Sequence, residues 1–84
     1  MNDQQQLKIV VRSPRGTRDM VFDKTDKVAQ IIEQARLAFG FEQGSFALSR
    51  ESTGEVFAPE RPLVSYHVKS GETLLLVPEM GSGV

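Results

Sequence analysis

The sequence predicts an α+β fold in which a mixed sheet of four to five strands packs on one helix. Three observations support this prediction. Apolar and polar residues alternate along residues 7–12 and 19–23, and a Pro-Gly turn separates these two segments. Residues 28–35 have the apolar spacing of an amphipathic helix. Residues 74–77 form an apolar run between a glycine and a proline, which favours a buried strand.

Length and composition limit the possible functions. Eighty-four residues form one domain with a small core. Ten basic and eleven acidic residues nearly balance and the basic ones are scattered, which argues against a nucleic-acid partner. The absence of cysteine excludes a disulfide, a thiolate zinc site and a cysteine nucleophile. Neither a signal peptide nor a membrane span is apparent, so we expect a cytoplasmic protein.

Residues 1–6 are polar and are expected to form a disordered leader before a domain of residues 7–78. Residues 7–12 then predict the first strand. The sequence SPRG at 13–16 predicts a turn, because proline fixes φ and glycine tolerates a positive φ. The chain should return antiparallel through residues 19–23, with Val21 facing outward. The residues expected to face the core are Leu7, Ile9, Val11, Met20 and Phe22.

The single helix is predicted from an apolar stripe with spacing i, i+3, i+4, i+7, made of Val28, Ile31, Ile32 and Ala35. Either Thr25 or Asp26 can cap its first turn. Gly40 ends it, and Phe39 and Phe41 are expected to hold the helix end on the sheet. The opposite, polar face is expected to carry Lys27, Gln30, Glu33, Gln34 and Arg36.

The second half of the chain supplies the remaining strands. Residues 45–50 predict a strand with Phe46 and Leu48 inward and Ala47 outward, followed by a turn and a brief strand at 56–57. Prolines keep residues 59–62 irregular. The terminal strand ends at Pro78, and residues 79–84 are expected to be a flexible tail, because glycines free its backbone. This order suits a β-grasp, in which the N- and C-terminal strands run side by side.

The segment LVSYHVKSGETLLLV at 63–77 has a specific pattern. A leucine is followed three residues later by tyrosine, then by an aliphatic residue, a polar turn, a threonine and an alternating apolar strand. This order resembles the closing segment of ubiquitin without a gap. The resemblance implies a ubiquitin-like β-grasp. The chain is most similar in character to bacterial ubiquitin-like modifiers that occur with activating-enzyme-like, conjugating-enzyme-like and JAB peptidase-like partners.

The same register implies a role for the tail. Gly83 falls on the terminal glycine of ubiquitin, Ser82 replaces the glycine before it, and Val84 is one residue too many. The resemblance implies that a JAB-type metallopeptidase removes Val84 and that Gly83 is activated with ATP and joined to a target amine. Only a glycine fits the narrow channel of such an activating enzyme closely. Because the usual Gly-Gly pair is broken, either the enzymes accept serine after Gly81 or the chain is not conjugated.

Glu79 and Met80 are assigned to recognition by the activating enzyme. Glu79 stands where ubiquitin carries an arginine that its activating enzyme reads through acidic contacts. The reversed charge implies that a ubiquitin-activating enzyme refuses this chain and that a dedicated partner with a basic or neutral groove accepts it. The alternative is that Glu79 is simply solvated.

An outward apolar group is expected on neighbouring strands, made of Val10, Ala47, Leu75 and Val77. The last three match the recognition surface of ubiquitin, with alanine in place of its central isoleucine. A contiguous apolar group on a small domain marks a partner site, although single exposed apolar residues are ordinary. Because Ala47 buries less area than isoleucine, binding should be weaker than that of ubiquitin.

Other residues have simpler expected roles. Tyr66 matches a tyrosine that in ubiquitin hydrogen-bonds to nearby backbone, so it is expected to be structural. His67, the only histidine, is expected to be solvated. The resemblance singles out Lys69 as a possible acceptor for self-conjugation. No catalytic residue, metal site or cofactor is predicted, because no phosphate loop, HExxH motif or paired-carboxylate site is present, and we expect a protein that is not an enzyme.

Two alternatives to a modifier stay open. A noncovalent ubiquitin-like binding module, such as a secretion accessory or adaptor, would use the same face without its terminus. Deleting residues 79–84 would then leave partner binding intact. A sulfur carrier shares the β-grasp and carries a terminal thiocarboxylate. Because such carriers normally end in Gly-Gly, Ser82 and Val84 count against that class.

Overall fold

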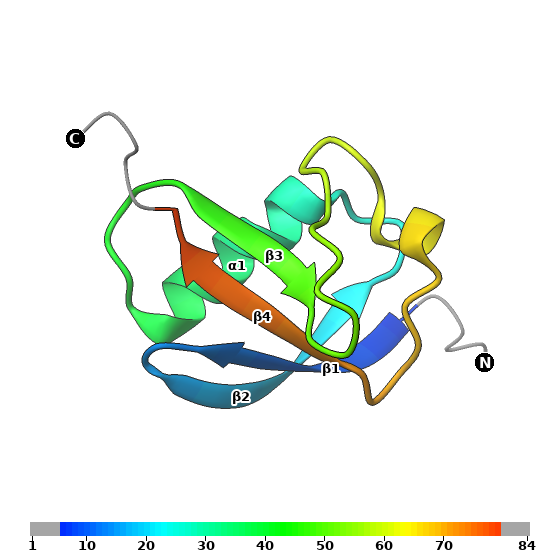
Figure 1. The fold of residues 1–84 in the computed structure, drawn as a ribbon, viewed down its shortest axis with the longest axis horizontal. Helices are drawn as coiled ribbons and strands as arrows, with labels where there is room; N and C mark the ends of the chain where they lie inside the picture. Colours follow the sequence, from blue (N-terminus) through cyan, green and yellow to red (C-terminus); the bar gives the residue numbers. More distant parts are fainter. Residues whose placement is uncertain (1–5, 80–84) are drawn as a thin grey trace.

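The protein folds as one mixed sheet with one helix across a single face (Figure 1). The computed structural model describes residues 6–79. The strand order across the sheet is β2-β1-β4-β3. This arrangement confirms the predicted α+β fold. The elements in chain order are β1 (Gln6–Ser13), β2 (Gly16–Asp23), α1 (Val28–Phe39), β3 (Phe46–Arg50), a 3-10 helix η1 (Leu63–Tyr66) and β4 (Thr73–Pro78).

The two central strands, β1 and β4, come from opposite ends of the sequence and run parallel. On either side, β2 pairs antiparallel with β1 and β3 pairs antiparallel with β4. Strand β1 begins at Gln6, one residue before the expected start, because Gln6 pairs with Asp23. At the other end, the Glu79 N–H donates to the Ser45 carbonyl at 2.8 Å. The backbone pairing of β3 and β4 therefore continues into the segment that was expected to be a free tail.

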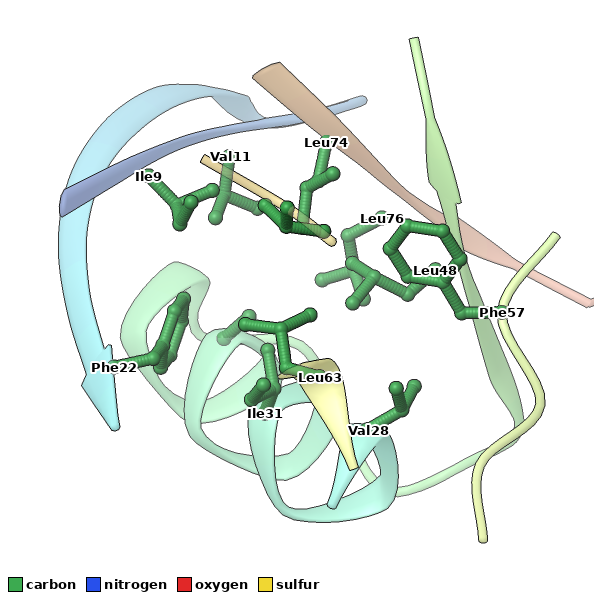
Figure 2. Packing of buried hydrophobic residues seen from close by; sticks show 12 residues of the cluster. Ile9, Val11, Phe22, Val28, Ile31, Leu48, Phe57, Leu63, Leu74 and Leu76 are labelled. Carbon is green, nitrogen blue, oxygen red and sulfur yellow. The ribbon is translucent and has the colours of Figure 1, made fainter. Parts of the chain in front are cut away.

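The hydrophobic core fills the space between the sheet and the helix (Figure 2). The expected alternation is confirmed in the central strands, where Ile9 and Val11 of β1 and Leu74 and Leu76 of β4 are fully buried and Leu7 is partly buried. Met20, Ile32 and Phe46 pack at the margin of the core and stay partly accessible. The buried core residues are Ile9, Val11, Phe22, Val28, Ile31, Ala35, Leu48, Phe57, Leu63, Val68, Leu74 and Leu76.

The start of α1 differs from the prediction. Lys27 is the N-cap residue, and its N–H donates to the Gln30 side chain at 3.0 Å. Thr25 instead directs its N–H and hydroxyl to the Asp23 carboxylate, at 2.9 and 2.6 Å. These hydrogen bonds hold the pKa of the Asp23 carboxyl below its ordinary value, the hydroxyl contributing most. Neither Thr25 nor Asp26 caps the helix.

Backbone carbonyls distant in sequence take over the capping of α1. The Val28 N–H donates to the Arg61 carbonyl and the Ala29 N–H donates to the Pro59 carbonyl, both at 2.9 Å. The free amides of a first helical turn require acceptors, and here the irregular segment before η1 supplies them. The prediction of a side-chain cap is wrong because tertiary packing brings these carbonyls to the helix end.

The end of α1 is as predicted. Gly40 has a left-handed backbone, with φ of 76°, and its N–H donates to the Leu37 carbonyl at 3.1 Å. The Phe39 and Phe41 rings lie 6.2 Å apart, and Phe41 lies 5.1 Å from the ring of Phe46 in β3. The aromatic residues around Gly40 therefore connect the helix end to the sheet.

Arg36 is buried, although the helical pattern placed it on the polar face. Its side chain is 9% exposed and forms an ion pair with Glu33. The guanidinium also donates to the Phe41 carbonyl at 3.0 Å. Arg36 thus satisfies a backbone acceptor just past the helix.

The brief strand expected at residues 56–57 reduces to a single bridge between Ser49 and Val56. The Phe57 N–H donates to the Leu48 carbonyl at 2.9 Å, and the Phe57 side chain is buried. The segment therefore lines the outer edge of β3 without forming a fifth strand. The described part of the chain has a sheet of four strands.

Candidate functional site

The candidate site is on the face of the sheet opposite α1, where the strand register brings three apolar residues together. Leu75 in β4 lies between Arg12 of β1 and Ser49 of β3. One pleat further along, Val77 lies beside Ala47. We call Ala47, Leu75 and Val77 the outward patch. Val77 is 46% exposed, whereas the other two are half-buried.

Val10 lies apart from the outward patch. Its partner across the β1–β4 ladder is Thr73, one pleat before Leu75. Arg12 forms an ion pair with Glu51, whose N–H donates to the Thr73 carbonyl at 3.1 Å. The strand register therefore places this ion pair over β4, between Val10 and Leu75.

The ion pair gives the outward patch a charged border. Arg12 and Glu51 are both exposed, with side-chain exposures of 55% and 37%. Protein-binding surfaces commonly have an apolar centre and a polar rim. Glu51 could not be found from the sequence, because only the pairing of three strands places it beside Arg12.

A hollow of 230 Å³ adjoins the patch at the outer edge of β3. It reaches from Ala47 to Val56, which is 65% exposed, and to Glu79. Ile32 and Phe46, which stay partly accessible at the margin of the core, also line it. The hollow extends the apolar surface around the edge of the sheet, and the sequence pattern alone did not indicate it.

The C-terminal segment leaves the sheet beside the outward patch. Glu79 is exposed and follows Val77 by two residues. The hydrogen bond from its N–H to Ser45 sets where the chain departs, at the end of β4 (Figure 1). The other residues to which the sequence assigned recognition, processing and conjugation lie outside the described residues; they are Met80, Gly81, Ser82, Gly83 and Val84.

Tyr66 has the structural role that was expected of it. Its hydroxyl accepts a hydrogen bond from the Ala58 N–H at 2.7 Å. Its ring stacks on Phe57 with the centroids 4.2 Å apart and the planes inclined by 18°. The next residue, His67, is exposed and has φ of 56°. Lys69 is also exposed, and its N–H donates to the Glu72 carboxylate at 3.0 Å.

Within residues 6–79, no three histidine or carboxylate side chains are grouped closely enough to hold a metal ion. The one α-helix of this part of the chain is too short to cross a bilayer. What the described surface offers is an apolar patch with a charged border, which suits binding to another protein.

Comparison with solved structures places this architecture among known folds. A protein designed de novo on the basis of ubiquitin has a TM-score of 0.79 to this chain, with 20% identity over 96% of this chain and 99% of the design. The fold is ubiquitin-like. A ubiquitin-like domain of an Arabidopsis thaliana protein has a TM-score of 0.79 and 14% identity, over 95% of this chain and 84% of that domain. The ubiquitin-like domain of Plasmodium falciparum Dsk2 has 0.77 and 13%, over 88% and 99%.

At these identities the likeness establishes the ubiquitin-like fold alone. No protein-family model and no curated protein sequence matches the chain. The names of the three compared structures describe ubiquitin-like folds and domains, and none of them describes an enzyme.

Proposed function

We propose that this chain is a ubiquitin-like protein modifier that is cleaved after Gly83 and joined through Gly83 to amines of target proteins. The observation that carries the proposal is the position of the outward patch beside the departing C-terminal segment. Val77 is two residues from Glu79, so a partner bound to the patch is close to the chain that leads to Gly83. Binding and reaction could therefore be coupled in one enzyme complex.

The chemistry that we propose for the tail follows from the resemblance to ubiquitin. A JAB-type metallopeptidase hydrolyses the bond after Gly83 and exposes its carboxylate. That carboxylate attacks the α-phosphate of ATP, pyrophosphate leaves, and a nucleophile of a partner enzyme then displaces AMP. Finally the target amine displaces the enzyme and forms an amide bond. The chain is thus a substrate of partner enzymes in the cytoplasm and performs no catalysis itself.

Glu79 supports a dedicated activating enzyme within this proposal. Its side chain is exposed, and its backbone is held to Ser45, so the carboxylate is presented at a defined place next to the patch. An enzyme that uses this chain would place a basic or neutral surface there, and an acidic surface would be repelled.

The test is mass spectrometry of C-terminal peptides from an N-terminally tagged chain expressed in the cells in which it occurs naturally. The proposal predicts Gly83 as a free terminus and Gly83 linked to peptides of other proteins. Gly83→Ala should abolish the linked species. Gly44→Ala is the matched control, because it makes the same change outside the C-terminal segment, at a glycine without a positive φ and with room for a Cβ. Only uncleaved chain beyond Gly83 in every condition, with both variants alike, would overturn the proposal.

A noncovalent binding module is the second candidate, because the outward patch consists of β3 and β4 residues and includes nothing from the tail. Deletion of residues 79–84 distinguishes the two candidates. A modifier loses its attachment to target proteins, whereas a noncovalent module keeps its full function, because patch binding stays intact. Val77→Ser should reduce capture of partners in either case. Val21→Ser is its matched control, because Val21 is a valine of the same sheet face in β2 with 55% exposure.

A further inference from the structure

A second surface feature lies at the opposite end of the sheet from the outward patch. It is a hollow of 400 Å³ between the end of β2, η1 and the turn that leads into β4. Its apolar floor is formed by Leu7, Val64 and Val68. Its lining also includes two lysines, Lys24 and Lys69, together with His67. We call this feature the basic hollow.

Backbone hydrogen bonds hold the walls of the basic hollow together. The Val64 N–H donates to the Lys24 carbonyl at 2.8 Å, which joins η1 to the end of β2. The Gly71 N–H donates to the Lys8 carbonyl at 2.7 Å, which joins the turn after Lys69 to β1. Because these hydrogen bonds belong to the fold itself, binding requires little ordering of the chain.

Two carboxylates lie next to the lysines that line the basic hollow, and the Asp23 carboxylate interacts electrostatically with Lys24. The Asp23 carboxylate accepts two hydrogen bonds from Thr25. The Glu72 carboxylate contacts Arg50 at 3.1 Å as well as the Lys69 N–H. Within residues 6–79, neither Lys24 nor Lys69 forms an ion pair. Asp23 offsets part of the Lys24 charge, whereas Glu72 is paired with Arg50, so the two lysines leave a net positive charge beside the apolar residues of the hollow.

The volume of the basic hollow and the residues that line it indicate what kind of ligand it can bind. A hollow of 400 Å³ is at the small end of ligand sites. Its open shape can accommodate one side chain of a partner protein together with the residues on either side of that side chain. Val64 is 43% exposed and offers apolar area to an aliphatic side chain. Lysines at the rim complement carboxylates on either side of that side chain.

We propose that the basic hollow binds a short acidic segment of a partner protein, with one aliphatic side chain on the floor and flanking carboxylates at the rim. This site is distinct from the outward patch. Strands β1 and β4 run parallel (Figure 1). Leu7, near the beginning of β1, and Val77, near the end of β4, therefore lie at opposite ends of the sheet. A partner in the basic hollow therefore leaves the patch and the C-terminal segment accessible.

The test is an NMR titration of the ¹⁵N-labelled full chain with the blocked peptide acetyl-Gly-Asp-Leu-Asp-Gly-amide, up to several millimolar. Amide shifts should cluster at Leu7, Lys24, Val64, His67 and Lys69. The peptide with both Asp replaced by Asn should shift these amides far less, and so should the peptide with Leu replaced by Gly. Shifts that are absent, that lie on the outward patch, or that are equal for the Asn peptide would overturn the proposal.

Variants of the chain provide a second readout. Changing Lys24→Gln and Lys69→Gln together should weaken binding roughly tenfold, because two charge pairs are lost. Lys27→Gln makes the same charge change three residues from Lys24 and outside the hollow, and it should change affinity less than about twofold. These side chains are at the surface, so the variants keep dispersed spectra. An equal effect of Lys27→Gln would show general charge attraction and would reject the site.

Discussion

Replacing Tyr66 with phenylalanine removes one oxygen atom and tests how the segment before β4 is held. The lost hydroxyl accepts the Ala58 N–H at 2.7 Å, whereas the stack on Phe57 at 4.2 Å is kept. A hydrogen bond contributes about 0.5–1.5 kcal/mol net, and a partly buried N–H left without an acceptor adds its desolvation cost. We therefore expect Tyr66→Phe to lower the free energy of unfolding by about 1–2 kcal/mol.

Urea unfolding followed by circular dichroism measures this loss, with the slope against urea expected to stay unchanged. In thermal melts of a domain this small, each kcal/mol corresponds to a fall of about 4–8 °C in Tm. Tyr66→Leu is the control, because it removes both the hydroxyl and the aromatic stack and should cost clearly more. A Tyr66→Phe variant as stable as the parent would refute the reasoning, since it would show that water replaces the hydroxyl at no cost.

Three further predictions test the core, the helix end and the response to acid. Leu74→Ala should lower the free energy of unfolding by about 2–5 kcal/mol in urea titrations, because Leu74 is fully buried. Leu75→Ala, on the outward face, should cost much less, and equal losses would reject this register. Gly40→Ala should lower the free energy of unfolding by about 1–2 kcal/mol, because φ is 76° at this position, and Gly40→Asn should lower it less. A Gly40→Ala variant as stable as the parent would show that alanine is not strained there. Thr25 holds the pKa of the Asp23 carboxyl below its ordinary value. The ionised carboxylate therefore stabilises the fold above the ordinary carboxyl pKa, and this stabilisation is lost as pH falls through the lowered pKa. Asp23→Asn should thus flatten the pH dependence of the urea midpoint below about pH 4, and an unchanged slope would contradict this.

Patterns confined to one element predicted most of the fold. The period of two in β1 and β4 identified the inward residues, because successive side chains of a strand point to opposite faces. Gly40 marked the helix end, because glycine adopts the left-handed backbone at little cost. The order of elements and the ungapped likeness of residues 63–77 to ubiquitin were sufficient to predict the sheet and the single helix.

The surroundings of the outward patch could be predicted only in part from such patterns. Alternation correctly indicates that Leu75 and Val77 face away from the core. It does not say which residue of β1 lies beside them. The register places Arg12 next to Leu75 and Val10 next to Thr73, so an ion pair with Glu51 separates Val10 from the patch.

The sequence by itself determined the type of each main element and the face on which most of its residues lie. Only the tertiary structure decided what meets across elements: the carbonyls of Pro59 and Arg61 that cap α1, the burial of Arg36, and the lysines gathered around the basic hollow. The physical reason is the range of the interactions. Periodicity and turn chemistry act over a few neighbouring residues, whereas strand register and remote hydrogen-bond acceptors arise when segments far apart in sequence pack together.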